Sequence, residues 1–164
     1  MIPTPSGQEI RRAVGADAAA LIALYETEPV LTPAELRRQV ADALAYQPPS
    51  GILLLLGPAG RAEGACFILA PQAVDTFPAA LYVSNLFVAP PWREQGRGTA
   101  LLAAVEAEAR RSGLRFTRMI VPEPPRLLRR YERLGYVVDD LDYFMDRPVG
   151  EGPVEDASAE EAVA

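Results

Sequence analysis

The pattern of apolar and polar positions predicts a short strand followed by two helices. Residues 8–14 have the character of a strand, and Asp17 is a suitable N-cap for a helix after it. A second helix is predicted from Thr32-Pro33-Ala34-Glu35, because these residues combine a capping box with proline at the first helical position. The apolar faces of the two helices carry Ala18, Leu21, Ile22 and Tyr25, and then Leu36, Val40 and Leu44.

The rest of the chain alternates strand-like runs with two further helices. Gly113 and Gly135 each follow an amphipathic stretch and are expected to end a helix. Strands are predicted where short apolar runs lie between turns that contain glycine or proline. In chain order the predicted elements are strands 51–56, 64–70 and 80–88, a helix 99–112, a strand 115–121, a helix from Pro125, and strands 136–138 and 142–147.

The resulting element order, βααβββαβαββ, predicts a mixed α/β fold. Strands joined by short turns pair antiparallel, whereas the strand–helix–strand unit between residues 80 and 121 requires a parallel crossover. We therefore expect a mostly antiparallel central sheet with helices on both faces. Residues 1–149 are predicted to form a single domain. Residues 150–164, rich in glycine, alanine and glutamate, are predicted to be an acidic disordered tail.

The composition excludes several kinds of catalytic site. The 164 residues include no histidine and no lysine, and all 16 basic residues are arginine. Ser-His-Asp and Cys-His catalysis, zinc sites with histidine ligands and Schiff-base lysines are thereby excluded, and no metal site is expected. The single cysteine, Cys66, lies in an apolar run and is predicted to be a buried hydrophobic residue.

The charge distribution argues against nucleic acid and membranes as partners. The net charge is −6, but five acidic residues lie beyond residue 150, which leaves residues 1–150 at −1. There is no basic stripe for a phosphate backbone and no apolar run of the roughly 18 residues that a bilayer span needs. With no evident signal peptide and one cysteine, we expect a cytoplasmic protein.

The strongest local signal is the segment 85–102, in which a strand runs through a glycine-containing loop into a helix. Backbone N–H groups and the positive end of the helix dipole converge at such a junction and can bind an anion. Arg93 and Arg97 are expected to add donors at its rim. An ordinary turn is the simpler interpretation of Gly96-Arg97-Gly98. A dinucleotide-binding fingerprint also competes, but it lacks its third glycine because Leu101 stands there.

Two motifs in this order resemble those of the GCN5-related N-acetyltransferase (GNAT) family. The family's phosphate loop, Arg/Gln-x-x-Gly-x-Gly/Ala, is matched by Arg93-Glu94-Gln95-Gly96-Arg97-Gly98. Its second signature, a tyrosine near an aromatic-glycine helix end, is matched by Tyr131-Glu132-Arg133-Leu134-Gly135-Tyr136. The similarity of element order extends over residues 8–147.

The resemblance implies direct transfer of an acetyl group from acetyl-CoA to a primary amine, with an acyl-CoA N-acyltransferase-like fold. It implies that backbone N–H groups of residues 94–99 bind the pyrophosphate and that the main chain of residues 86–88 binds the pantetheine arm. Tyr131 would protonate the departing thiolate, although its position on an apolar stripe is also that of a core residue. The implied cofactor-binding residues are Leu86, Phe87, Val88, Arg93, Glu94, Gln95, Gly96, Arg97, Gly98 and Thr99.

The acceptor side is less defined by the sequence. Pro124 stands where many relatives have an asparagine that contacts the cofactor. Glu26 and Glu28 lie where relatives bind acceptors, and they are candidates for amine recognition or for a water-mediated base, although a solvated helix end explains them equally well. Trp92 is expected to pack under the loop. Tyr25, Tyr82 and Tyr143 are expected in the acceptor site or the core.

Three functions remain open on the sequence. The first is an N-acetyltransferase acting on a small-molecule or peptide amine. The second is a non-catalytic acyl-CoA-binding or interaction module, favoured by Pro124 and the lack of an obvious base. The third, a nucleotide-binding regulator, predicts better binding of ATP or NAD than of coenzyme A. The identity of the acceptor and the existence of a homodimer are left open.

Overall fold

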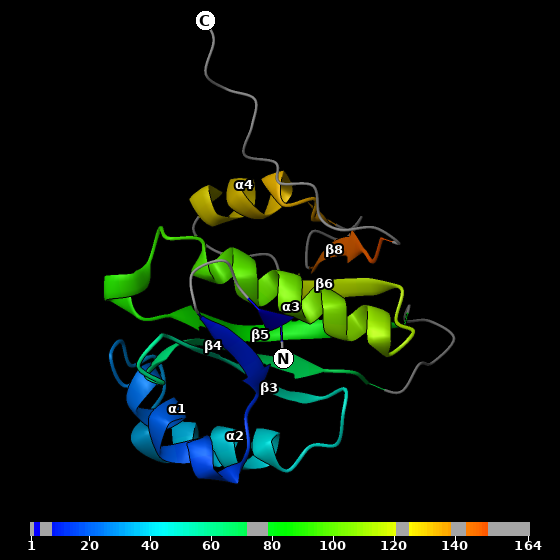
Figure 1. Cartoon of the computed structure of the whole chain (residues 1–164). Coiled ribbons are helices and arrows are strands. Elements are labelled where there is room, and N and C mark those ends of the chain that lie inside the picture. Colours follow the sequence, from blue (N-terminus) through cyan, green and yellow to red (C-terminus); the bar gives the residue numbers. More distant parts are fainter. Residues whose placement is uncertain (1, 4–7, 72–78, 121–124, 139–143, 151–164) are drawn as a thin grey trace, which may run out of the picture.

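The computed structural model describes residues 2–3, 8–71, 79–120, 125–138 and 144–150 (Figure 1). Within these residues, eight strands form one sheet in the order β1-β2-β3-β4-β5-β6-β8-β7. Neighbouring strands are antiparallel except β5 and β6, which are parallel. The predicted mixed, mostly antiparallel sheet and its element order are confirmed, with the two-residue strand β1 (Ile2–Pro3) added before the first predicted strand.

The N-terminal part forms strand β2 (Glu9–Arg12), a 3-10 turn (Gly15–Asp17) and helices α1 (Ala18–Tyr25) and α2 (Pro33–Leu44). The predicted capping box of α2 is confirmed, since the Thr32 hydroxyl accepts the Glu35 N–H and the Glu35 carboxylate accepts the Thr32 N–H. Asp17 holds the predicted N-cap position of α1, but its side chain makes no capping hydrogen bond to that helix. Asp17 lies inside the 3-10 turn, and its carboxylate accepts the Val14 N–H and pairs with Arg11.

Strands β3 (Gly51–Leu56), β4 (Ala62–Leu69) and β5 (Ala80–Val88) form the centre of the sheet. The run of four leucines in β3 is apolar at every position because both faces of the strand are covered. Ile52 and Leu54 face α1 and α2, whereas Leu53 and Leu55 face α3.

Helix α3 (Arg97–Arg111) connects β5 to the parallel strand β6 (Phe116–Ile120). The helix begins two residues before the predicted start because Gly96, with φ +76°, serves as its N-cap. Gly113, with φ +70°, ends it, and the Leu114 N–H donates to the Ala109 carbonyl. The predicted role of Gly113 is confirmed.

The C-terminal part consists of helix α4 (Pro125–Arg133) and strands β7 (Val137–Val138) and β8 (Phe144–Pro148). Gly135, with φ +84°, ends α4 as predicted, and the Tyr136 N–H donates to the Tyr131 carbonyl. Strand β8 lies between β6 and β7. The first residues of the predicted strand 142–147 and most of the predicted tail lie outside the described residues.

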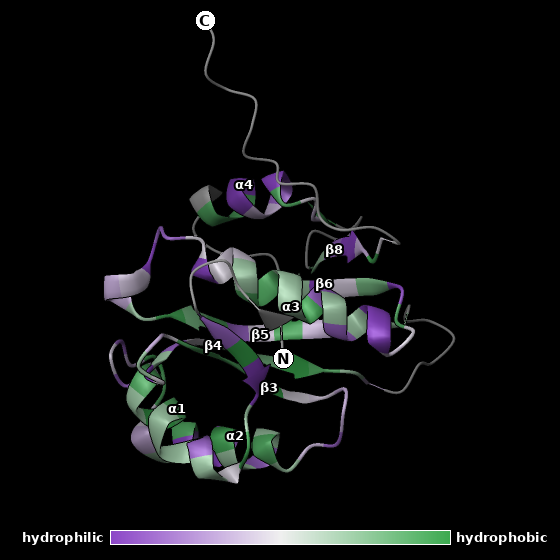
Figure 2. Cartoon of the chain, in the orientation of Figure 1, coloured by the Kyte–Doolittle hydropathy of each residue, from purple (hydrophilic) through white to green (hydrophobic). Residues whose placement is uncertain are grey.

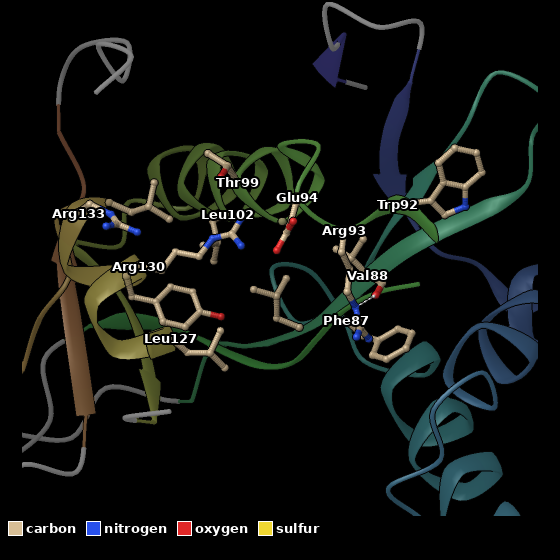
Figure 3. A pocket seen from close by; sticks show the side chains of 14 residues that line it. Phe87, Val88, Trp92, Arg93, Glu94, Thr99, Leu102, Leu127, Arg130 and Arg133 are labelled. Atoms are coloured by element: carbon tan, nitrogen blue, oxygen red, sulfur yellow. Dashed lines mark hydrogen bonds between the residues drawn. The ribbon is translucent and has the colours of Figure 1, made fainter. Parts of the chain in front are cut away.

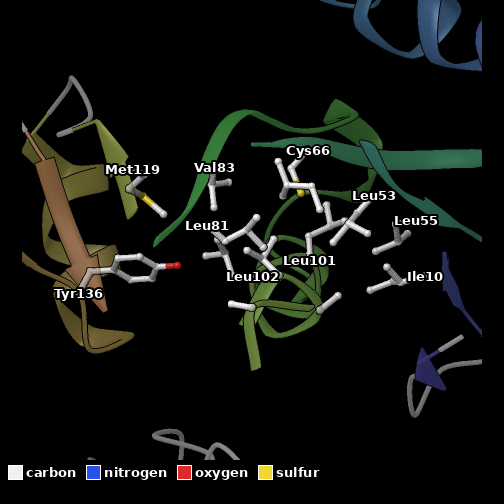
Figure 4. Packing of buried hydrophobic residues seen from close by; sticks show 14 of the residues in the cluster. Ile10, Leu53, Leu55, Cys66, Leu81, Val83, Leu101, Leu102, Met119 and Tyr136 are labelled. Carbon is white, nitrogen blue, oxygen red and sulfur yellow. The ribbon is translucent and has the colours of Figure 1, made fainter. Parts of the chain in front are cut away.

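Apolar residues form one core on each face of the sheet (Figure 2). On one face α1 and α2 cover Phe67 and Leu54. On the other, Leu101 and Leu102 of α3 pack against Leu53, Leu81 and Cys66 (Figure 4). Cys66 is fully buried, and burial raises the pKa of its thiol to about 12, in agreement with its predicted packing role. None of the described helices has the length and apolar character needed to cross a bilayer.

Candidate active site

Strand β5 separates from β6 part-way along its length. The two strands pair only from Ala80 to Val83. Beyond this point β5 contains a bulge, because Ser84 pairs with Phe67 but Phe87 pairs with Ala65, and Asn85 has φ +48°. On the β6 side, no described strand pairs with the last five residues of β5. Main-chain groups of this segment are therefore available to a ligand, apart from the Asn85 and Val88 carbonyls, which accept hydrogen bonds from Tyr25 and Arg93.

The loop after β5 has the backbone geometry of an anion-binding site. Glu94 and Gly96 both have left-handed backbone angles, with φ +59° and +76°, and alternation of this kind turns successive N–H groups toward one side. Gly98 and Thr99 lie in the first turn of α3, where backbone N–H groups have no acceptor within the helix. An ideal Cβ on Gly96 would meet no atom within 4 Å, so only backbone conformation favours glycine there.

A cleft of about 620 Å³ lies between this loop, the freed end of β5 and helix α4. Figure 3 shows Arg130 of α4 extending toward the loop and Arg93 lying beside Phe87. The volume is within the range of about 300–1,000 Å³ that small-molecule sites occupy. The cleft is lined by Leu86, Phe87, Val88, Trp92, Arg93, Glu94, Gly98, Thr99, Leu102, Leu127, Arg130, Tyr131, Arg133 and Leu134.

Arg97 does not have the predicted position at the rim of the cleft. Its guanidinium donates to the Glu63 carboxylate at 2.6 Å and to the Gln95 side chain at 2.7 Å. The side chains of Arg97 and Glu63 are only 9% and 3% exposed. A buried carboxylate in β4 requires a counter-charge, and Arg97 provides it from beneath the loop. Gln95, Gly96 and Arg97 are absent from the cleft lining, so of these three only main-chain groups remain candidates for ligand binding.

Trp92 is held beneath the loop by two arginines. Its ring centroid lies 4.9 Å from the Arg61 guanidinium carbon and 4.6 Å from that of Arg97. The indole also packs against the core that α1 and α2 cover. The expected packing of Trp92 under the loop is therefore observed.

Tyr131 lines the cleft from α4 and packs against the α3 core. Its ring meets Tyr136 edge to face, with centroids 6.0 Å apart. Burial raises the pKa of the Tyr131 phenol above its ordinary value. The hydroxyl therefore stays protonated at neutral pH and can donate a proton or a hydrogen bond to a group in the cleft.

A second cavity, of about 240 Å³, lies on the opposite side of the β5 end. The aromatic rings of Tyr25, Phe67 and Phe87 lie close together there, with centroids 5.8 Å apart for Tyr25–Phe67 and 5.3 Å for Tyr25–Phe87. The Tyr25 hydroxyl donates to the Asn85 carbonyl at 2.6 Å, which ties α1 to the bulge of β5. The lining residues are Tyr25, Glu28, Pro29, Val30, Leu31, Leu36, Gln39, Phe67, Asn85, Leu86 and Phe87.

An ion pair connects the two cavities. Arg93 donates through both terminal nitrogens to the two carboxylate oxygens of Glu28, and through Nε to the Val88 carbonyl at 3.0 Å. The hydrogen bond from Arg93 is the main cause of a lowered pKa for Glu28, whose carboxylate is therefore ionised at neutral pH. Of the two predicted acceptor-side glutamates, Glu28 lines the second cavity and Glu26 lines neither cavity.

Several lining residues were not predicted as site residues. Arg130 and Arg133 add positive charge to the cleft, and Gln39 and Asn85 add amides to the second cavity. The arginine-rich sequence of α4 was the available signal for the first pair, since Arg130 shares a helix face with Leu127 and Leu134. No sequence pattern connected Gln39 with Asn85, which lie 46 residues apart and are joined by a hydrogen bond.

Comparison with known families decides between the interpretations left open by the motifs. Residues 68–147, which contain the freed end of β5, the loop and α4, match the family model for the acetyltransferase (GNAT) domain. This chain carries a GNAT acetyltransferase domain. The resemblance inferred from the two motifs is confirmed, and no curated protein matches the sequence.

Solved structures share the fold of this GNAT protein at low sequence identity. A GCN5-related N-acetyltransferase from Kribbella flavida superposes with a TM-score of 0.67 at 20% identity, covering 88% of this chain and 99% of that one. The ribosomal-protein-S18-alanine N-acetyltransferase from Escherichia coli gives 0.67 at 16% identity, with 89% and 96% covered. A GNAT-family acetyltransferase from Streptococcus pneumoniae gives 0.66 at 21% identity, with 87% and 99% covered.

The remaining predicted residues of the GNAT domain have other positions. Tyr82 lies outside both cavities and meets Phe144 edge to face, with centroids 6.1 Å apart. Pro124 and Tyr143 lie outside the described residues. Among the residues that are described, no group of three or more potential ligands gathers to hold a metal ion.

Proposed function

We propose that this GNAT protein transfers an acetyl group from acetyl-CoA directly to a primary amine. One observation carries the proposal: Leu86 and Phe87 line both cavities, so the bulged end of β5 is a shared wall. A thioester in the arginine-lined cleft and an amine in the second cavity would meet at this wall. Holding both reactants in place makes their reaction effectively unimolecular.

The residues of the cleft are suited to the parts of acetyl-CoA. The left-handed loop and the N–H groups of Gly98 and Thr99 are complementary to a pyrophosphate, and Arg130 and Arg133 add positive charge. The main chain of residues 86–88, apart from the Val88 carbonyl that accepts from Arg93, can pair with the amide-containing pantetheine arm as a missing strand would. An N–H group of this segment can also stabilise the oxyanion that forms on the acetyl carbonyl.

The reaction then requires one bond to form and one to break. The ammonium group of the acceptor loses one proton to water, and its nitrogen lone pair attacks the thioester carbon. The nitrogen loses a second proton to water as the tetrahedral adduct collapses. The C–N bond forms, and the C–S bond breaks with its electron pair leaving on sulfur. Tyr131 gives its phenolic proton to this thiolate and regains one from solvent, so the products are an N-acetyl amide, coenzyme A and one proton.

Calorimetric titration with acetyl-CoA tests the first half of the proposal. We expect Gly96→Glu to weaken binding by about 100-fold or more, because a side chain at φ +76° strains the loop and its carboxylate adds a negative charge to the anion-binding loop. Gly60→Glu is the matched control. Gly60 has φ +71° and, like Gly96, has no atom within 4 Å of an ideal Cβ, but it lies in the β3–β4 turn. It should leave binding unchanged.

Thiol release in the presence of amines tests the second half. Cys66 is buried with a raised thiol pKa, so a thiol reagent should report coenzyme A without background from the folded protein. Failure of a folded protein to bind acetyl-CoA would overturn the proposal. Tight binding without turnover on a broad amine panel would instead favour the non-catalytic acyl-CoA-binding module.

A further inference from the structure

We propose that the second cavity selects a small primary amine on a short apolar body without a carboxylate beside the amine, and that Glu28 binds its ammonium group. The inference rests on the proposed acetyl transfer and names the class of acceptor. It draws on the size, lining and charge of the cavity that α1, α2, β4 and β5 enclose.

The size and lining of the cavity favour a compact apolar group. Its volume of about 240 Å³ is smaller than that of sites for drug-sized ligands. Three aromatic rings and four aliphatic side chains dominate the wall, and the Tyr25 hydroxyl is already used by the Asn85 carbonyl. The amides of Gln39 and Asn85 bond to each other at 3.3 Å. Burial of an apolar body is therefore the main attraction that the wall offers.

The charge of the cavity favours a cation. Among the described residues that line it, Glu28 is the one with a formal charge. A carboxylate has about four lone-pair positions, and Arg93 uses two of them, so Glu28 can still accept hydrogen bonds from an ammonium group. The lowered pKa of Glu28 keeps it ionised, which suits recognition of a cation better than removal of a proton.

The same geometry disfavours an α-amino acid. Its carboxylate would lie close to Glu28 whenever its ammonium group is bound there, and like charges repel. Arg93 offsets this repulsion only in part, because its charge is shared with Glu28 and three of its five N–H groups already donate to Glu28 and to the Val88 carbonyl. The selection against α-amino acids therefore follows from the repulsion between two carboxylates beside an arginine whose charge already balances Glu28.

Matched acceptors test the inference. 3-Methylbutylamine is leucine without its carboxylate, and 3-methylbutan-1-ol is its uncharged counterpart. With acetyl-CoA saturating, we expect kcat/KM for the amine to exceed that for leucine by about 10-fold or more. A tetrapeptide that begins with leucine serves as the peptide arm. Turnover of leucine or of the peptide equal to or faster than that of the amine would overturn the inference.

Glu28→Gln should lower kcat/KM for 3-methylbutylamine by about 10-fold, because the amide carries no negative charge to attract the ammonium group. Glu26→Gln is the matched control, because Glu26 lies two residues before Glu28, carries the same charge and lines neither cavity. It should stay within about twofold of the parent protein. Equal effects of the two substitutions, or no effect of Glu28→Gln, would contradict the role of Glu28.

Direct binding separates this inference from the proposed function. Saturation-transfer NMR without acetyl-CoA should show contact of 3-methylbutylamine with the parent protein and weaker contact of the alcohol and of leucine. If acetyl-CoA binds but 3-methylbutylamine does not, the acceptor class is wrong and acetyl transfer stands. If 3-methylbutylamine binds but acetyl-CoA does not, the proposed function fails and the cavity's selectivity stands.

Discussion

The two cavities share a wall but are built in different ways. Most residues of the larger cleft come from the continuous segment 86–102, whose main chain supplies the features complementary to an anion. The smaller cavity is assembled from side chains of α1, α2, β4 and β5 and from the connection between the helices. One site depends on local backbone conformation, and the other depends on how distant segments pack.

This difference separates what the family shares from what is particular to this chain. A backbone site tolerates changes of side chain, so a short motif is enough to mark it. A side-chain site changes whenever one of its contributing segments changes. Perturbing the supports of each cavity separately should therefore affect different steps of the reaction. The effects should decrease from the buried Glu63–Arg97 pair beneath the loop to the hydrogen bond between Tyr25 of α1 and Asn85 of β5.

The largest effect is expected from Glu63→Gln. This substitution leaves Arg97 buried beside an uncharged group, and breaking such a pair costs about 3–5 kcal/mol of unfolding free energy. Because Arg97 begins α3 directly after Gly96, acetyl-CoA binding should weaken as well. Urea denaturation and calorimetry of the variant measure the two effects.

Glu28→Gln provides the contrast, because it makes the same chemical change in the exposed pair with Arg93. It should leave the denaturation midpoint unchanged. The double variant Glu63→Gln/Arg97→Gln should recover part of the lost stability, since no buried charge remains unpaired. Equal stability of the two single variants would show that the pair beneath the loop is not a structural support.

Tyr131→Phe should affect the chemical step and leave the loop intact. We expect kcat to fall by about 100-fold, the low end for general acids, because a thiolate is already a good leaving group. The Kd for acetyl-CoA should be unchanged. Since burial raises the phenol's pKa above about 10, the parent protein should lose no activity from this group between pH 7 and about 9.

Tyr136→Phe is the control for this prediction. Tyr136 packs against the Tyr131 ring and accepts a hydrogen bond from the Thr117 hydroxyl at 3.1 Å, but it does not line the cleft. Its substitution should lower stability by about 1 kcal/mol with kcat unchanged. A normal kcat in Tyr131→Phe would assign Tyr131 to the core, as its apolar helix face allows.

The sequence predicted the parts of the protein that depend on local conformation. Gly113 and Gly135, the capping box at Thr32 and the loop at Gly96 each express a backbone requirement within a few residues. Arg97 was misplaced because its partner, Glu63, lies 34 residues away in β4 and is buried. The sequence also did not decide whether Tyr25 belongs to the core or to the acceptor site, because its partners in β4 and β5 are distant in the sequence. The predicted domain limits, cytoplasmic location and homodimer stay untested.

Tyr25→Phe should have the smallest effect and should be confined to the second cavity. It removes the hydroxyl that donates to the Asn85 carbonyl and leaves the three-ring cluster in place. We expect a loss of about 1 kcal/mol in stability and a rise of about threefold in KM for the amine. The Kd for acetyl-CoA should not change. The measurements are urea denaturation, steady-state kinetics and calorimetry.

The bulge of β5 is the physical reason why we expect Tyr25→Phe to affect the amine and not acetyl-CoA. Asn85 holds a left-handed angle, φ +48°, which asparagine adopts more readily than most other residues and which contacts with its neighbours help to fix. The Tyr25 hydroxyl is one such constraint, and burial raises its pKa well above the ordinary value, so it remains a donor throughout the working pH range. Without it, the wall can relax on the acceptor side while the loop, held by Glu63 and Arg97, keeps its shape. If Tyr25→Phe weakened acetyl-CoA binding as much as amine binding, the two cavities would be coupled through the bulge and their supports would not be independent.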